Sequence, residues 1–234
     1  YYYSFLITAL RLVMPPGSKK TEERKKAKVK KPVSIPVVRD LAEVSITVPD
    51  NRFTLTHEQS NAIEAIKQAL DSNKPETFLL YGVTGSGKTE VYMRTIAHLL
   101  EKGKSAIVMV PEIRLTPQLI QRFRERFGAQ IAVLHSELAE KLRREEWGRI
   151  AASEARIVLG TRSAVFAPVK DLGMVVIDEE YETSYKSDKS PRYHVREVAQ
   201  KLAELNNAVV VLGSATPSVE TYYKTELGEI HKLA

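Results

Sequence analysis

Residues Gly82-Val83-Thr84-Gly85-Ser86-Gly87-Lys88-Thr89 decide the fold of this chain. They have the form G-x-x-x-x-G-K-[ST]. The segment before them, 77–81, is apolar and rich in residues that favour strands. The segment after them, 90–102, carries apolar residues at helical spacing. A strand, a glycine-rich loop and a helix in this order predict a P-loop, which binds phosphate groups.

The predicted loop has the chemistry that a polyphosphate needs. Its glycines allow backbone N–H groups to point at phosphate oxygens. The N-terminus of the following helix adds further N–H groups and the positive end of its dipole. We expect Lys88 to reach the β- and γ-phosphates and Thr89 to place its hydroxyl on Mg²⁺. A glycine-rich turn without a ligand is the alternative, and the flanking strand and helix argue against it. The residues predicted to bind the phosphates of a nucleotide are Gly82, Gly85, Ser86, Gly87, Lys88 and Thr89.

Composition narrows the class of protein. The chain has 234 residues, enough for one α/β domain with extensions. Its 43% hydrophobic and 27% charged residues are typical of a soluble globular protein. The absence of cysteine excludes disulfides, thiol catalysis and thiolate zinc sites, so we predict no zinc site. Without a long apolar run or a signal peptide, we expect no membrane contact and a cytoplasmic, nucleoid-associated location.

The net charge of +6 comes from one segment. Between Lys19 and Lys31 the chain has eight basic and two acidic residues, which account for the whole excess. The high charge is therefore weak evidence for a basic DNA-binding face on the globular part. We favour a solvated linker for this segment, and a dedicated nucleic-acid arm is the alternative.

Four parts follow from the order of these segments. Residues 1–17 are predicted to be the C-terminal tail of a preceding domain, with an interfacial membrane helix as the weaker alternative. Residues 18–51 form a basic, Pro- and Val-rich linker. Residues 52–225 form the nucleotide-binding domain. Residues 226–234 begin a linker that follows it.

Strands and helices alternate along the predicted domain. A helix at 56–72 opens on a capping box, in which Thr56 is the N-cap and Gln59 lies three residues later. Further helices are predicted at 116–127, 140–153, 194–206 and from Ser218. Strands are predicted at 77–81, 105–110, 131–134, 156–159, 174–177 and 208–212, the last of the sheet. This alternation predicts an α/β fold, with a parallel sheet covered by helices on both faces and ligands at the carboxyl ends of its strands.

An acidic pair follows the apolar strand at 174–177. A buried strand that runs into Asp178 and Glu179 has the Walker B arrangement. We expect Asp178 to hold Mg²⁺ and Glu179 to orient the attacking water, so that Lys88, Asp178 and Glu179 are the catalytic residues. An acidic turn without function is the alternative. Ser214 and Thr216 follow the strand at 208–212 and belong to the same edge, although a strand-to-helix turn capped by Thr216 or Ser218 also explains them.

With these motifs in view, the sequence resembles the PriA family of replication-restart DNA helicases, which belong to superfamily 2. The resemblance covers about 53–223. It implies a RecA-like P-loop NTPase lobe, ATP-dependent DNA helicase activity and action in primosome assembly. The matching stretches are 82–92, 110–118, 134–136, 160–163, 178–180, 184–186, 190–194 and 212–217.

The resemblance implies roles by position. Gln59 corresponds to the glutamine that recognises adenine, and Ser214 and Thr216 to a motif linking hydrolysis with strand separation. Bases are expected to stack on Tyr185 or Tyr193. Implied partners are single-stranded and forked DNA, primosome proteins and single-strand-binding proteins. The residues implied in contact with the DNA backbone are Thr116, Gln118, Thr161, Arg162 and Ser163. The residues implied in sensing DNA and coupling it to hydrolysis are Tyr181, Tyr185, Lys186, Arg192, Tyr193 and His194.

The chain departs from the family pattern at several points. Tyr181 stands where the acidic motif usually has histidine, and Glu137 where the family usually has glycine. From the resemblance we expect the second lobe, to which 226–234 would lead, to be missing together with its arginine fingers and cysteine-bound zinc. We expect the winged-helix region to be absent or reduced to 18–51. We therefore expect ATP–Mg²⁺ binding with little hydrolysis and no unwinding by this chain alone. The alternatives are another P-loop enzyme, which 185–194 and 213–216 disfavour, and a non-hydrolysing fragment that binds nucleotide or DNA only.

Overall fold

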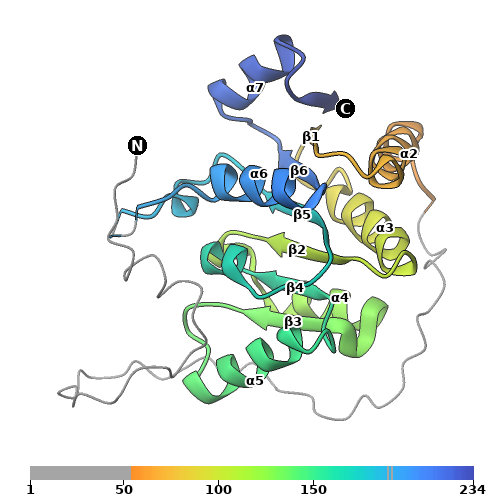
Figure 1. Ribbon diagram of the computed structural model, residues 1–234. Helices are drawn as coiled ribbons and strands as arrows, with labels where there is room; N and C mark the ends of the chain where they lie inside the picture. The colour runs from red at the N-terminus through yellow and green to blue at the C-terminus, as the bar shows by residue number, and fades with distance from the viewer. Residues whose placement is uncertain (1–53, 189, 191) are drawn as a thin grey trace.

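The computed structural model describes residues 54–188, 190 and 192–234 (Figure 1). The predicted tail at 1–17 and the basic linker at 18–51 lie outside the described residues.

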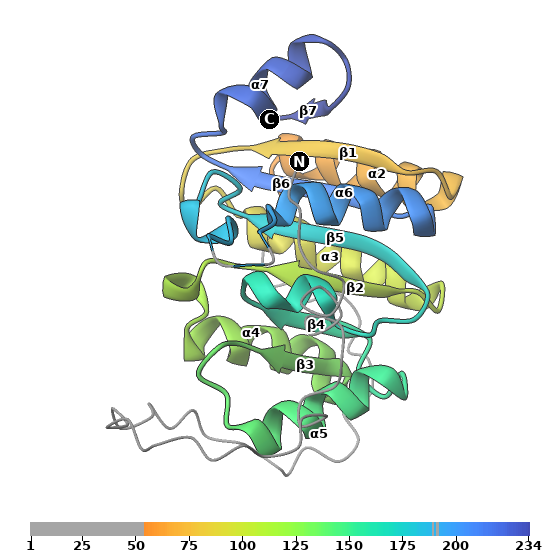
Figure 2. The same cartoon turned by 60° about the vertical axis from the view of Figure 1, so that its left-hand side comes forward.

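A single parallel sheet forms the centre of the described part. Its seven strands have the order β3-β4-β2-β5-β6-β1-β7, and every pairing is parallel. Figure 2 shows this order from β7 at one edge to β3 at the other. The strands are β1 Glu76–Tyr81, β2 Ser105–Met109, β3 Ile131–Leu134, β4 Ile157–Gly160, β5 Leu172–Asp178, β6 Val209–Ser214 and β7 His231–Leu233.

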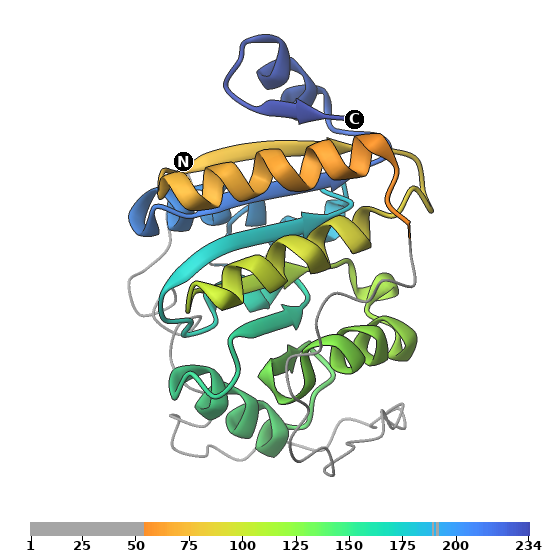
Figure 3. The ribbon, with the colours of Figure 1, turned by 90° about the vertical axis from the view of Figure 1, so that its right-hand side faces the viewer.

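Helices cover both faces of the sheet. One face carries α2, α3 and α4, which Figure 3 presents to the viewer, and the other carries α5 and α6. The helices are α2 His57–Ser72, α3 Lys88–Glu101, α4 Pro117–Phe127, α5 Glu140–Ala151, α6 Val195–Asn206 and α7 Val219–Glu226. Short 3₁₀ turns are η1 Glu112–Arg114, η2 Gly128–Gln130, η3 Arg162–Phe166 and η4 Thr183–Tyr185. The predicted α/β architecture is confirmed.

The two faces explain why the strands are apolar throughout. Along β5, Met174 and Val176 belong to the core beneath α2, α3 and α4. Val175 and Ile177 belong to the core beneath α6. Each of these side chains is 0–1% exposed, and burial of one such residue is worth about 1.5–3 kcal/mol. A strand buried on both faces therefore reads as a continuous apolar run.

One expectation about the sheet is wrong. The strand predicted at 208–212 is not the last, because β7 adds to the far side of β1, with Phe78 opposite His231. His231 and Lys232 are exposed, so this three-residue edge strand lacks an apolar run. The helix expected from Glu90 begins two residues earlier, at Lys88, since Gly87 is its N-cap.

The capping box at the start of α2 is confirmed. The Thr56 hydroxyl accepts from the backbone N–H of Gln59 at 3.2 Å, and the Gln59 side chain accepts from the N–H of Thr56 at 3.0 Å. We expect Thr56→Ala to lower the free energy of unfolding by about 1 kcal/mol, because a backbone donor of the first turn loses its partner. Urea unfolding measures this loss. Thr56→Ser keeps the hydroxyl and is the matched control, so equal stability of the two variants would contradict the prediction.

Candidate functional site

The phosphate loop connects β1 to α3. Its Gly85 and Gly87 have φ values of 84° and 83°, a region that side chains other than glycine rarely adopt. At Gly87 a Cβ would also collide with the Gln59 amide nitrogen. The Gly87 carbonyl accepts from the N–H groups of Glu90 at 2.8 Å and Val91 at 3.3 Å. The loop is thus curled and ends directly on a helix N-terminus, where an anion is favoured.

Lys88 lies inside the curl of this loop. Its ammonium donates to the carbonyl oxygens of Gly82 at 2.6 Å and Val83 at 3.2 Å. The residue is only 8% exposed. Thr89 is half-buried and lines the adjoining cavity. The sequence therefore brings a buried cation and a hydroxyl to the start of α3.

Gln59 joins α2 to the phosphate loop. Its amide oxygen completes the capping box, and its amide nitrogen donates to the carbonyl of Ser86 at 2.7 Å. Both ends of the amide are therefore engaged within the protein. A base that bound Gln59 would replace one of these hydrogen bonds.

Asp178 ends β5 and lies opposite the phosphate loop. Its carboxylate accepts from the Tyr92 hydroxyl at 3.1 Å. A Cβ at Gly213 would overlap that hydroxyl, so only glycine permits this approach. Burial, followed by the neighbouring charge of Glu179, raises the pKa of Asp178, while Tyr92 and Lys88 oppose the rise. Burial is also the main reason that the pKa of Tyr92 lies well above its ordinary value.

Glu179 is held in an unusual position. Its φ of 49° is left-handed, which is uncommon for a residue other than glycine. Its side chain is 5% exposed and accepts from the Arg114 guanidinium at 2.7 Å. Arg114 lies in the stretch 110–118 of the family resemblance, but the sequence predicted no role for it because its partner lies far along the chain.

These residues line one cavity of about 150 Å³. Two carboxylates and a threonine hydroxyl are hard oxygen groups of the kind that Mg²⁺ prefers. Among the described residues no group of three or more His, Cys, Asp or Glu could hold a metal ion. Mg²⁺ in phosphate sites needs no such cage, because it keeps waters and phosphate oxygens as ligands. The residues present therefore fit a magnesium-bound polyphosphate. The lining residues are Thr84, Gly85, Gly87, Lys88, Thr89, Arg114, Arg122, Asp178 and Glu179.

Glu180 forms a second polar centre beside this cavity. It is 2% exposed and accepts from the Ser218 N–H at 2.6 Å, the Thr221 hydroxyl at 3.1 Å and the Arg196 guanidinium at 3.2 Å. It ties the end of β5 to α6 and α7. Sequence reasoning missed this centre. The only signal was an acidic residue at the end of a buried strand.

Ser214 and Thr216 follow β6 at the same edge. The Ser214 hydroxyl accepts from the Thr216 N–H at 3.0 Å, and Ser214 itself is 0% exposed. Thr216 is exposed. The N-cap of α7 is Ser218, so Thr216 does not cap the helix.

Tyr185 is buried rather than presented to solvent. It is 1% exposed, and its hydroxyl donates to the backbone carbonyl of Asp178 at 2.7 Å. This conformation offers no face of Tyr185 to a base. Tyr193 is half-buried and makes an edge contact with Phe166, with ring centroids 5.0 Å apart. Exposed residues of this region are Tyr181, Lys186 and Arg192.

Arg162 fastens the segment that contains Tyr185. Its guanidinium donates to the carbonyls of Ser184 at 3.1 Å and Lys186 at 2.7 Å. Lys186 in turn forms an antiparallel bridge with His194. Arg162, two residues beyond the end of β4, is thus joined by hydrogen bonds to the segment after β5.

The other predicted DNA contacts follow β2 and β4, which are neighbours in the sheet. Thr116 caps α4 by accepting from the Leu119 N–H at 3.3 Å, and Gln118 and Ser163 are exposed. Thr161 is 3% exposed. A small cavity of about 90 Å³ lies between these strand ends and η4, lined by Val110, Glu112, Thr161, Arg162, Ser184 and Tyr185.

A family model for DEAD/DEAH box helicases matches residues 56–225 of this chain. The chain belongs to the DEAD/DEAH box helicase family. Helicases of this family use ATP. The residues that line the phosphate cavity all lie within the matched range, which we call the helicase lobe.

Two relatives share the sequence of the helicase lobe closely. Replication restart protein PriA of Bacillus subtilis (strain 168) is 55% identical over 198 residues, which cover 85% of this chain and 25% of that protein. PriA of Treponema pallidum (strain Nichols) is 48% identical over 181 residues, covering 77% and 27%. The chain spans about a quarter of the length of the curated relatives it matches. The predicted resemblance to the PriA family is confirmed.

A solved structure supports the fold of the helicase lobe. RecG bound to a three-way DNA junction superposes with a TM-score of 0.57 and 25% sequence identity, over 78% of this chain and 24% of that chain. The predicted RecA-like fold is confirmed. In the part of the helicase lobe that the structure describes, no helix is both long and apolar enough to cross a membrane.

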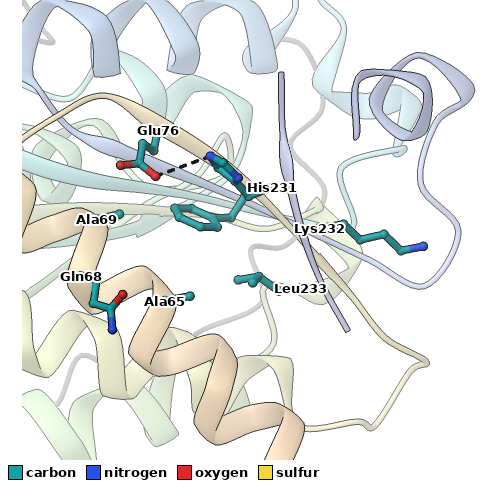
Figure 4. Close-up of a pocket in the computed structure, with 8 residues that line it drawn as sticks. Ala65, Gln68, Ala69, Glu76, His231, Lys232 and Leu233 are labelled. Atoms are coloured by element: carbon teal, nitrogen blue, oxygen red, sulfur yellow. Dashed lines mark ion pairs between the residues drawn. The ribbon is translucent and has the colours of Figure 1, made fainter. Parts of the chain in front are cut away.

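A larger cavity of about 440 Å³ lies elsewhere in the helicase lobe, between α2, β1 and β7 (Figure 4). Figure 4 shows Glu76 and His231, which both line this cavity, joined as a pair. The Glu76 carboxylate and His231 Nε2 are 3.6 Å apart. Glu76 opens β1, whereas the phosphate loop follows the other end of that strand. This cavity is therefore separate from the phosphate cavity.

His194 caps α6 in its neutral form. Its Nδ1 accepts from the Arg196 N–H at 3.2 Å. Burial, followed by the charge of Arg196, lowers the pKa of His194 below its ordinary 6.5; Lys186 adds to this, and Glu197 and Glu180 oppose it. As the pH falls through about 6.5 the unfolded chain takes up this proton first, so the contribution of His194 to stability is complete above that pH and is lost below it.

We therefore expect His194→Asn to weaken the loss of stability between about pH 7.5 and 5.5, while asparagine keeps the cap. Some pH dependence remains, because burial also lowers the pKa of His135. Urea unfolding at several pH values measures the slope, with the exposed His57→Gln as control. An unchanged slope in His194→Asn would contradict the assignment.

Proposed function

We propose that this chain is the ATP-binding motor lobe of a replication-restart DNA helicase. The observation that carries the proposal is the single cavity shared by the phosphate loop and the acidic pair, with Lys88 and Thr89 on one side and Asp178 and Glu179 on the other. The relatives named replication restart protein PriA support the biological setting. In the whole protein, ATP hydrolysis drives translocation on single-stranded DNA and duplex unwinding.

Each residue of the cavity has a role in this proposal. The backbone N–H groups of the loop and the N-terminus of α3 hold the phosphates. Lys88 contacts the β- and γ-phosphates, and Thr89 and Asp178 hold Mg²⁺. The bound Mg²⁺ supplies charge stabilisation to the transferring phosphoryl group. Glu179 orients water, and Gln59 meets the adenine by giving up one of its present hydrogen bonds.

Single-stranded DNA lies across the carboxyl ends of β2 and β4. Exposed Gln118 and Ser163 contact its phosphates, together with Thr116. Half-buried Tyr193 and the exposed Tyr181, Lys186 and Arg192 contact bases or phosphates beside η4. The similarity to RecG, whose structure was solved bound to a three-way DNA junction, supports forked DNA as the substrate class.

Coupling runs through hydrogen bonds that join the acidic pair to the segment around Tyr185. The Tyr185 hydroxyl donates to the backbone carbonyl of Asp178 at 2.7 Å. The Arg162 guanidinium donates to the backbone carbonyl of Lys186, next to Tyr185, also at 2.7 Å. A strand of DNA that moves Arg162 therefore moves Tyr185 against the magnesium ligand. Glu180 links Asp178 to the segment of Ser214 and Thr216, which transmits hydrolysis toward strand separation. Thr161 precedes Arg162, and His194 forms a bridge with Lys186, so both adjoin this path. Primosome and single-strand-binding proteins act on it from outside.

Nucleotide and DNA titrations test the proposal. We expect MgATP to bind the chain and to change its affinity for single-stranded oligonucleotides, measured by fluorescence anisotropy. ATP turnover with and without single-stranded DNA is measured beside it, for the chain and for Lys88→Ala. MgATP binding that depends on Lys88 supports the proposal, and any DNA-stimulated turnover must also depend on Lys88. An absence of MgATP binding would overturn it.

A further inference from the structure

The ion pair between Arg114 and Glu179 is asymmetric. The Arg114 side chain is 43% exposed, whereas that of Glu179 is 5% exposed. Arg114 ends the short turn η1, ahead of α4. A long, half-exposed side chain can leave this pair by rotation alone, while the buried carboxylate stays in place.

Arg114 also lines the phosphate cavity. The carboxylates of Asp178 and Glu179 would face an incoming polyphosphate, and of the two only Glu179 has an ion pair with a cation of the lining. Arg114 neutralises the charge of Glu179. Arg122, another cation of the lining, is paired with Glu90 at 3.2 Å. Arg114 is thus the cation whose partner belongs to the acidic pair itself.

The guanidinium of Arg114 keeps further donors for a ligand. It carries five N–H groups in a planar fork that suits phosphate oxygens. Within the part of the chain that the structure describes, its side chain makes one hydrogen bond, to Glu179. Lys88, by contrast, is fixed on two carbonyl oxygens of the loop.

We propose that Arg114 leaves Glu179 and contacts the γ-phosphate when a nucleoside triphosphate binds. This inference rests on the proposed function, since it needs nucleotide in the cavity. The lobe then distinguishes a triphosphate from a diphosphate with an arginine of its own. Departure of Arg114 also frees the Glu179 carboxylate to orient water. Arg114 therefore binds the phosphate group that is to be transferred.

Titrations with ATP and ADP in the presence of Mg²⁺ test this role of Arg114. We expect Arg114→Gln to weaken ATP binding about tenfold, because a charge-assisted contact to the γ-phosphate is lost. ADP binding changes less than about twofold, since it lacks that phosphate. Arg114→Lys keeps the charge but not the fork, so its ATP affinity lies between. The exposed Arg144→Gln on α5 controls for loss of a positive charge. Circular dichroism and the melting temperature verify that the variants are folded.

Glu179→Gln separates a phosphate contact from simple neutralisation. If Arg114 contacts the γ-phosphate, Arg114→Gln still weakens ATP binding in the Glu179→Gln background. No effect in that background, or equal weakening of ATP and ADP, overturns the inference. In that case Lys88-dependent binding by the unaltered chain leaves the proposed function intact. Failure of the unaltered chain to bind ATP overturns both.

Discussion

Replacing Glu180 with alanine is expected to lower the free energy of unfolding by about 3–5 kcal/mol, as loss of one member of a buried ion pair does. The Glu180 carboxylate is 0% exposed and the Arg196 side chain 19% exposed. Ser218 and Thr221, the other partners of Arg196, are neutral and cannot replace the lost charge. The variant therefore leaves a largely buried guanidinium without an anion, and it also leaves the Ser218 N–H without its acceptor.

Urea unfolding of the variant measures this cost. Glu204→Ala is the control, since it breaks the exposed pair with Lys201 on α6, where both side chains are more than half exposed. An exposed pair is worth about 0–1 kcal/mol. Glu180→Gln, which retains an acceptor but not the charge, should fall between the two. Similar small losses for Glu180→Ala and Glu204→Ala would contradict the view of Glu180 as a structural centre.

Replacing Lys88 with alanine is expected to weaken MgATP binding by at least about a hundredfold. Charged hydrogen bonds are worth about 1.5–3 kcal/mol each, and the ammonium is placed to make two, to the β- and γ-phosphates. The side chain is 8% exposed and already aimed into the loop by two carbonyl oxygens. The Lys88 side chain is already ordered, so it loses little conformational entropy when phosphate binds. Most of the interaction energy therefore contributes to affinity.

Thermal shift with increasing MgATP measures the effect, because a ligand that binds only the folded chain raises its melting temperature. The unaltered chain should show a shift that saturates, and Lys88→Ala should show none over the same range. Lys201→Ala, which removes an exposed lysine on α6, is the control and should behave like the unaltered chain. A normal rise in the melting temperature of Lys88→Ala with MgATP would show that Lys88 does not contribute to nucleotide binding.

Local sequence pattern predicted most of the sheet because every internal strand is buried on two faces. Val209 to Leu212 and Ile157 to Leu159 are 0–1% exposed, and short, continuous apolar runs are typical of strands that helices cover on both sides. The edge strand β7 could not be predicted in this way. Its residues are mostly exposed, and only the register with β1 makes it a strand. This pairing depends on β1, which lies about 150 residues earlier in the sequence, so the local pattern around β7 does not reveal it.

Parts of the site had the same limitation. The glycine spacing identified the phosphate loop, because its backbone conformation needs Gly85 and Gly87 at fixed positions. The sequence pattern, however, does not distinguish a buried tyrosine in a loop from an exposed one. Tyr185 is buried because its ring packs in the core beneath α6, where its hydroxyl also finds a backbone carbonyl of β5. The partnership of Arg114 and Glu179 depends on two turns meeting at one sheet edge, which spacing along the chain does not reveal.

The position of β1 within the sheet has a consequence for synthesis of the chain. Strand β1 lies between β6 and β7, and Glu76 pairs with Val209. When the phosphate loop leaves the ribosome, neither neighbour of its supporting strand has yet been made. Parallel pairings over such distances are slow to form. The nucleotide site therefore cannot mature during translation of its own residues, and it must wait for the C-terminal third of the chain.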